Sequence, residues 1–105
     1  MCSYDLKDAK ALAEAGVFAI VLELVPAELA TAISQELNIP IIGIGAGNGC
    51  DAQVIVWTDL MGLTENPPKF AKAYRKLRGE ISGGVKEWMK DVASGKFPSD
   101  EQSFH

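Results

Sequence analysis

The sequence is poor in the residues on which many catalytic and metal sites depend. Its 105 residues include one histidine, His105, and two cysteines, Cys2 and Cys50, which do not form a CxxC pair. Neither a zinc site nor a Ser-His-Asp triad can therefore be built from this chain alone. Two cysteines this far apart, in a chain without export features, are typical of a reducing compartment.

Long apolar runs and an excess of positive charge are also missing. The apolar runs are well below the roughly 20 residues that a membrane-spanning helix needs. The first ten residues, MCSYDLKDAK, lack the basic and apolar regions of a signal peptide. A formal net charge of −4 argues against nucleic acid or an anionic membrane as a partner. We therefore expect a cytoplasmic protein that binds neither.

What the sequence does contain is an alternation of helical and strand-like hydrophobic patterns. Apolar residues at helical spacing predict helices, whereas continuous apolar runs predict parallel strands buried on both faces. The predicted elements are helices over residues 5–15, 27–37 and, with a bend or break at Gly83 and Gly84, 68–94; strands over 17–22, 39–44 and 53–57; and a loosely ordered polar tail over 95–105. This order predicts a single α/β domain over residues 1–105, with about three parallel strands.

Two features indicate that these strands belong to a larger sheet. All three are strongly apolar, and proteins seldom leave the edges of such strands bare. The connection between the second and third strands has only about one helical turn, in NGCDA, whereas a parallel crossover takes a dozen residues or more. We therefore expect part of a larger sheet or of a closed barrel, whose edges are covered by a second copy or by another chain.

One carboxylate interrupts the apolar stretch VFAIVLELVPAELA, residues 17–30, and this is Glu23. In parallel α/β folds the active site lies at the carboxyl ends of the strands. A partly buried carboxylate there is suited to removing a proton next to a carbonyl group. The alternative is a solvated acid at a strand end, or a charge that stabilises the N-terminus of the helix near Pro26. Spacing alone favours this alternative.

A glycine run, GIGAGNG, follows the second predicted strand. Its continuation GNGCDA fits the G-x-G-x-x-A form of a dinucleotide-binding turn, but that turn must open a full helix, and here another strand is predicted to follow. The better interpretation is a strand packed so tightly inside a barrel that only glycine fits beside its neighbours. The glycines concerned are Gly43, Gly45, Gly47 and Gly49.

Two further polar features carry less information. Asp59 follows the predicted strand VIVW, and it either lines the same rim as Glu23 or starts a turn. A basic stretch on the last predicted helix is most simply a solvated face, with Tyr74 and Leu77 turned toward the core. Its members are Lys69, Lys72, Arg75, Lys76 and Arg78.

Several longer segments together resemble one enzyme family. They are VLELVPAELA, IPIIGIGAGNGCDAQVIVWTDLMGL, PKFAKAY and SGKFPSDEQSFH. Their order, spacing and closing residues are similar to the C-terminal part of the ketopantoate hydroxymethyltransferases, and the resemblance covers essentially the whole chain. It implies the C-terminal part of a (β/α)8 barrel, a fold of roughly 250 residues, with the three strands as the sixth, seventh and eighth. It also implies a cytosolic, oligomeric enzyme of pantothenate and coenzyme A synthesis.

The resemblance further implies a reaction and a role for Glu23. The family moves a hydroxymethyl group from 5,10-methylenetetrahydrofolate to 3-methyl-2-oxobutanoate, forming 2-dehydropantoate, with Mg²⁺ chelating the keto-acid. Its proton acceptor lies in the motif LE-x-VP, here residues 22–26, so that Glu23 is the implied base. Many relatives have cysteine where this chain has Leu24. The family's metal ligands and the residues gripping the substrate carboxylate lie on earlier strands, and none can be assigned to this chain.

Three hypotheses follow about how the chain works. It is part of the transferase and nearly inactive by itself; or it assembles with itself or with a chain that supplies the other strands; or it keeps only a structural or binding role and self-associates through exposed strands. We expect the first two to involve a small keto-acid substrate. The third predicts no turnover.

Overall fold

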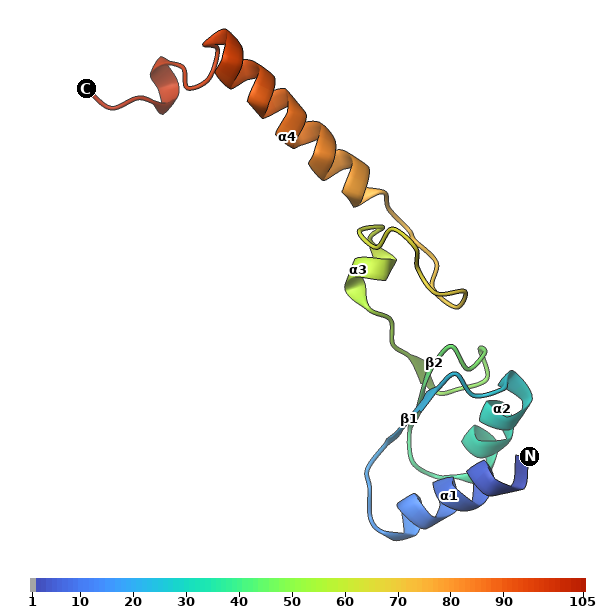
Figure 1. Ribbon diagram of the computed structural model, residues 1–105. Coiled ribbons are helices and arrows are strands. Elements are labelled where there is room, and N and C mark those ends of the chain that lie inside the picture. Colours follow the sequence, from blue (N-terminus) through green and yellow to red (C-terminus); the bar gives the residue numbers. More distant parts are fainter. Residues whose placement is uncertain (1) are drawn as a thin grey trace. The chain divides into compact units, whose positions relative to one another are not determined.

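The computed structural model describes the backbone of residues 2–105 and the side chains of residues 6–105 (Figure 1). The chain divides into two compact units, where the sequence led us to expect one domain. The first unit holds the residues up to Val56 together with Pro68–Ala71, and the second holds Trp57–Pro67 and Lys72–His105. We describe each unit by itself.

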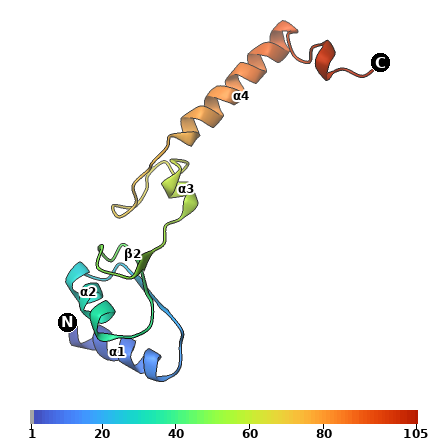
Figure 2. The same ribbon diagram turned by 180° about the vertical axis from the view of Figure 1, so that it is seen from behind.

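The first unit contains two helices and a three-stranded sheet. Its elements are α1 (Cys2–Glu14), β1 (Ile20–Glu23), α2 (Ala27–Glu36), β2 (Ile41–Ile44) and β3 (Ala52–Gln53). The strands pair in the order β1-β2-β3, and both pairings are parallel. The predicted α/β architecture with three parallel strands is thus confirmed. Figures 1 and 2 show α1 and α2 side by side in this unit.

The sheet is covered on one face only. Ile20 and Leu22 of β1 are buried, whereas Val21 and Glu23, which point to the opposite face, are exposed. The prediction that this strand is buried on both faces is therefore wrong for the residues that the structure describes. The reason is that, among residues 6–105, the residues of α1 and α2 that are buried pack with Ile20 and Leu22, whereas no buried residue packs on the face of Val21 and Glu23.

The hydrophobic core of the first unit joins one face of α2 to the sheet. Leu29, Ala30 and Ile33 lie at helical spacing and are buried. They pack with the buried residues of α1, of the strands and of the loop after β2, namely Ala9, Ile20, Leu22, Ile41 and Ala46. Hydrophobic spacing alone was enough to place α2, which ends one residue before its predicted end.

The connection from β2 to β3 is made without a helix. The N–H of Asp51 donates to the carbonyl oxygen of Ile41 (2.9 Å), and Oδ2 of Asp51 accepts from the N–H of Ile41 (2.8 Å). The loop lies directly on α2, because a Cβ atom at Gly49 would overlap the hydroxyl of Thr31. Close approach to α2 therefore explains a glycine here, but in a loop against a helix and not in the barrel strand that the sequence predicted.

The third predicted strand is much shorter than expected. The sequence predicted residues 53–57, but only Ala52 and Gln53 are assigned to β3, followed by one more bond from the N–H of Val54 to the carbonyl oxygen of Gly43 (3.0 Å). Trp57 instead begins the short helix α3 (Trp57–Leu60). Among the described residues no strand pairs with the outer edge of β3. The apolar residues that follow Gln53 therefore have no second neighbouring strand with which to form backbone hydrogen bonds.

The second unit differs from the predicted helix over residues 68–94. Residues 69–76 are not helical, and α4 (Leu77–Ser94) begins only after them. The N–H of Tyr74 donates to the carbonyl of Leu60 (2.7 Å), and that of Leu77 to the carbonyl of Met61 (3.0 Å). Both N–H groups therefore bond to carbonyl groups of another segment, and not to those four residues earlier, as the predicted helix would require. No bend occurs at Gly83 and Gly84, because glycine weakens helix propensity without breaking the hydrogen-bond pattern (Figure 1).

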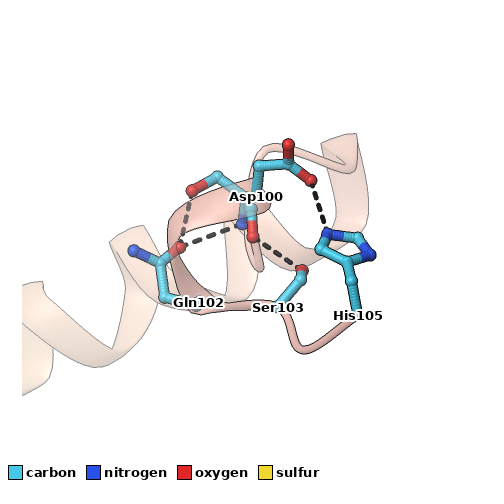
Figure 3. Close-up of polar contacts among 5 residues, drawn as sticks. Asp100, Gln102, Ser103 and His105 are labelled. Carbon is cyan, nitrogen blue, oxygen red and sulfur yellow. Dashed lines mark hydrogen bonds and ion pairs between the residues drawn. The ribbon is translucent and has the colours of Figure 1, made fainter.

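The tail after α4 forms a local turn, where we had predicted loose order. Gly95 ends the helix in a left-handed conformation, and the Phe97 ring contacts Trp88 edge-on, with centroids 6.5 Å apart. A short 3-10 helix, η1 (Asp100–Gln102), follows. Figure 3 shows its contacts, in which Ser103 donates to the backbone of residue 99 and His105 lies 3.2 Å from a carboxylate oxygen of Asp100. Short-range polar contacts therefore organise this segment.

Candidate functional site

Glu23 is the last residue of β1 and lies on the uncovered face of the sheet. It pairs in register with Ile44, the last residue of β2, so both lie at the carboxyl end of the parallel pair. Its side chain is exposed because nothing within the described residues covers this face, which agrees with the solvated strand-end alternative and not with the partly buried one. Within the same residues its carboxylate makes no hydrogen bond or ion pair. It is therefore open to a ligand from the solvent side.

The residue after Glu23 turns the chain sharply. Leu24 has a φ of 55°, a left-handed conformation that costs a non-glycine residue roughly 1–3 kcal/mol. Its N–H donates to the carbonyl oxygen of Ile44 (3.0 Å). Two residues further on, Pro26 immediately precedes α2. The strand, the turn and the helix N-terminus thus follow one another within four residues.

An open cavity of about 670 Å³ lies beside this turn. Its wall includes Leu24, Gly45, Cys50, Gln53, Lys69 and Phe70, all from the first unit, and it does not include Glu23. The cavity mixes apolar side chains with one lysine, the amides of Asn48 and Gln53 and one carboxylate, that of Asp51. Gln53 of the cavity wall is also exposed at the carboxyl end of a strand, but an amide is no base, so Glu23 remains the candidate residue for proton abstraction.

Cys50 is unsuited to nucleophilic chemistry at neutral pH. Burial raises the pKa of its thiol, and the negative charge of the neighbouring Asp51 raises it further. A thiol that keeps its proton is a weak nucleophile. Cys50 is a free cysteine, as the sequence predicted. The side chain of Cys2, the other cysteine of that prediction, lies outside the described side chains.

Asp59 does not stand at the end of a strand. The sequence placed it directly after the third strand, but β3 ends at Gln53 and Asp59 lies within α3 in the second unit. It is 8% exposed, and within the described residues its side chain forms no hydrogen bond. The carbonyl of Asp59 accepts from the N–H of Gly62 (3.2 Å), so it begins a turn, which was the second of the two predictions.

The basic stretch lies on the segment before α4 and at its first turn. Its five members are exposed, as a solvated face requires, but most of them are not helical. The Lys72 Nζ lies 4.8 Å from the centre of the Tyr74 ring, and Arg78 pairs with Glu65 at 3.5 Å. The prediction that Tyr74 points to the core is wrong, because this exposed segment offers no buried face to its ring.

Neither a nucleotide nor a metal ion is supported by the side chains present. The segment GNGCDA leads into β3 rather than into a helix, so the dinucleotide interpretation fails as the sequence predicted. Among residues 6–105 no three His, Cys, Asp or Glu side chains converge on one point. The Mg²⁺ that the resemblance implies therefore does not fit the described residues alone, and we derive no step through it.

Among the described residues, Glu23 is the carboxylate that is both exposed and placed at the carboxyl end of a strand, and the turn at Leu24 follows it directly. Glu23 was singled out from the sequence, whereas Leu24 was noted only as a departure from the family motif. A leucine carries no signal for a left-handed conformation, so sequence reasoning had no means of finding the turn.

No helix among residues 2–105 has the length and apolar character needed to cross a bilayer.

Comparison with known proteins matches almost the whole chain to one family. Residues 4–100 match the family model described as ketopantoate hydroxymethyltransferase. The 3-methyl-2-oxobutanoate hydroxymethyltransferase of Streptomyces coelicolor is 54% identical over 101 residues, which are 95% of this chain and 35% of the relative. The enzyme of the same name from Acidothermus cellulolyticus is 55% identical over 98 residues, with shares of 92% and 36%.

A third relative gives the same result. The 3-methyl-2-oxobutanoate hydroxymethyltransferase of Pyrococcus abyssi is 52% identical over 96 residues, which cover 91% of this chain and 34% of the relative. The chain thus spans about a third of the length of the curated relatives that it matches. These matches include the LE-x-VP segment that led us to the resemblance, and the chain belongs to the ketopantoate hydroxymethyltransferases, a family of transferases.

Proposed function

We propose that this chain supplies the proton-abstracting base, Glu23, to an enzyme that hydroxymethylates 3-methyl-2-oxobutanoate. In this reaction the carboxylate takes the proton on the carbon next to the keto group. The resulting enolate carbon forms a bond to the one-carbon unit of 5,10-methylenetetrahydrofolate, and the bonds between that unit and the two folate nitrogens break. Water supplies the hydroxyl group, and the products are 2-dehydropantoate and tetrahydrofolate. The whole reaction needs residues beyond this chain, which spans about 35% of the Streptomyces coelicolor relative.

The observation that carries the proposal is the place of Glu23. It is the last residue of a parallel strand and is exposed on the face opposite α1 and α2. Active sites of parallel α/β folds lie at the carboxyl ends of strands. A carboxylate within hydrogen-bond reach of an acidic C–H can act as general base, which contributes about 10² to 10⁴ in rate.

We further propose that β1, β2 and β3 are part of a (β/α)8 barrel. Three features support this: the parallel pairing, the uncovered apolar face that includes Val21, and the strand edges that have no neighbour among residues 2–105. Inside a closed barrel this face would be the interior, and Glu23 would point toward its upper rim. Helices α1 and α2 would then belong to the outer layer.

The remaining parts of the site would come from outside this chain. In our proposal, another chain or segment holds Mg²⁺, the substrate carboxylate and 5,10-methylenetetrahydrofolate, because no matching ligand group converges among residues 6–105. The partner is a polypeptide that supplies the missing strands, or further copies of this chain in a homo-oligomer. The strand edges and the exposed Val21 and Val54 support such association. The cytoplasm is the compartment we propose.

Complementation tests this function directly. The chain is mixed with the N-terminal two-thirds of the Streptomyces coelicolor relative, and light scattering shows whether a complex forms. Formation of 2-dehydropantoate is then measured with Mg²⁺ and both substrates. We expect activity only in the complex, and we expect Glu23→Gln to lower kcat by at least about 100-fold. The matched control is Glu28→Gln, which removes an exposed glutamate in the first turn of α2.

Two results would contradict the proposal. One is a complex in which Glu23→Gln turns over at the wild-type rate. The other is a stable complex that has no activity with wild-type Glu23, which would leave the chain a structural role only.

A further inference from the structure

The residue beside the proposed base has an unusual backbone. Leu24 is the single non-glycine residue with a positive φ, 55°, among residues 2–105. Leucine has no side-chain group that favours this left-handed conformation, unlike asparagine or aspartate. Such a conformation persists only where the surrounding structure holds it, and it often lies at a functional site.

The turn reverses the alternation of β1 directly after Glu23. Ile20 and Leu22 are buried and Glu23 is exposed, so a continuing strand would bury residue 24 on the side of α1 and α2. Instead Leu24 is 66% exposed, and Val25 is the residue that packs against the core. Glu23 is thereby the last side chain with strand geometry, and the chain leaves the sheet immediately beyond it.

Contacts from two other segments fix the turn. The N–H of Leu24 donates to the carbonyl oxygen of Ile44 (3.0 Å), and Ile44 is also the strand partner of Glu23. The Leu24 side chain and the Phe70 ring both lie over Gly45, where an added Cβ would be 3.0 Å from each. All of these residues belong to the first unit. Glu23 is therefore held on its N-terminal side by strand pairing and on its C-terminal side by the turn.

From this geometry we infer that Leu24 is a positioning residue for Glu23 and acts through its left-handed backbone. The inference rests on the proposed function, in which Glu23 removes the substrate proton. A base that is displaced by about 1 Å can lose roughly 100-fold in rate, so a fixed exit direction from β1 matters for that step. The Leu24 side chain has the lesser role of closing the turn over Gly45.

Two substitutions at residue 24 distinguish the effect of the backbone conformation from the effect of the side chain. Leu24→Val keeps an apolar side chain, but β-branching disfavours a positive φ. Leu24→Asn loses the apolar contact but tolerates the left-handed conformation. In the complemented enzyme we expect Leu24→Val to lower kcat by about 10- to 100-fold with little change in KM for the keto-acid. We expect Leu24→Asn to stay within about threefold of wild type, because its turn is kept.

The opposite ranking would overturn the inference. If Leu24→Val keeps the wild-type kcat, or if Leu24→Asn falls as far as Leu24→Val, the backbone conformation does not position the base. Glu23→Gln is measured in parallel. Full activity of that variant means that the proposed function fails, whereas a dead Glu23→Gln beside a fully active Leu24→Val means that only the present inference fails.

An NMR measurement on the 105-residue chain gives a readout that does not depend on turnover. Glu23 and Ile44 are register partners on the same face, so a nuclear Overhauser effect is expected between the Glu23 Hγ protons and the Ile44 methyl groups. We expect this Overhauser effect to persist in Leu24→Asn and to disappear in Leu24→Val. An unchanged effect in Leu24→Val contradicts the inference.

A second variant tests the turn without changing residue 24. Gly45→Ala places a methyl group against the Leu24 and Phe70 side chains, at a residue whose φ is itself 66°. We expect it to lower kcat and to weaken the same Overhauser effect. If both stay at wild-type values in a folded Gly45→Ala protein, Leu24 does not position Glu23.

Discussion

The two units of this chain use similar hydrophobic patterns with opposite results. In the first unit α2 buries Leu29, Ala30 and Ile33 against the sheet. In the second unit α4 repeats apolar residues at the same kind of spacing, yet none of its residues is buried. Ile81, Val85 and Trp88 are all about half exposed. An apolar stripe therefore predicts that a helix forms, but burial needs a matching surface, and only the first unit supplies one from its own residues.

The largest expected difference between the units concerns side-chain truncation. Ile33 is completely buried, so Ile33→Ala should lower the free energy of unfolding of the first unit by about 3 kcal/mol. Val85→Ala, on the exposed stripe of α4, should change the free energy by less than about 0.5 kcal/mol. Amide hydrogen exchange of α2 and of α4 measures the two effects separately. Equal effects would mean that α4 is buried against something in solution.

Glycine substitutions should act in opposite directions in the two units. At Gly49 a Cβ overlaps Thr31, so Gly49→Ala should destabilise the first unit by about 2 kcal/mol. At Gly84, in the middle of α4, an added Cβ meets nothing within 4 Å. Gly84→Ala should therefore stabilise α4 by up to about 1 kcal/mol. Chemical denaturation and hydrogen exchange check both signs, and a destabilising Gly84→Ala would show that another surface lies against α4.

The smallest expected effect is a pH dependence confined to the first unit. The pKa of the Cys50 thiol is raised in the folded state, so its protonated form favours folding. This contribution is fully present below the ordinary thiol pKa and is lost as pH rises through the raised one. Denaturation of wild type and Cys50→Ser from neutral to alkaline pH should show a steeper fall in stability for wild type. Hydrogen exchange of α4 should be the same in both proteins once intrinsic exchange rates are taken into account.

Local patterns were sufficient to predict the elements that the chain completes by itself. The helical spacing of Leu29, Ala30 and Ile33 and the apolar run IPIIGI place α2 and β2 within two residues of their observed bounds. The same reasoning failed for β3, because VIVW has strand-like residues but no neighbouring strand within residues 2–105. It also failed for residues 68–76, which form no helix and in which the N–H of Tyr74 bonds to the carbonyl of Leu60 in α3.

The candidate site shows a similar division. The position of Glu23 at a strand end followed from the run of apolar residues before it, and its proposed role came from the LE-x-VP motif. Its exposure agrees with the solvated alternative that spacing favoured, but the sequence of this chain does not show what covers the second face of the sheet. The left-handed Leu24 could not be predicted either, since its contacts are with Ile44, Gly45 and Phe70 from distant parts of the sequence.

The helix-free loop between β2 and β3 has a consequence for how this family can diverge. Because the loop lies on α2, a larger residue at position 47 or 49 must be matched by a smaller one at Ala27 or Thr31. Asp51 adds a second constraint, since its carboxylate and its N–H both bond to the backbone of Ile41 and so fix the length of the loop. We expect paired changes between the loop and α2 among relatives, and few insertions between Ile44 and Ala52.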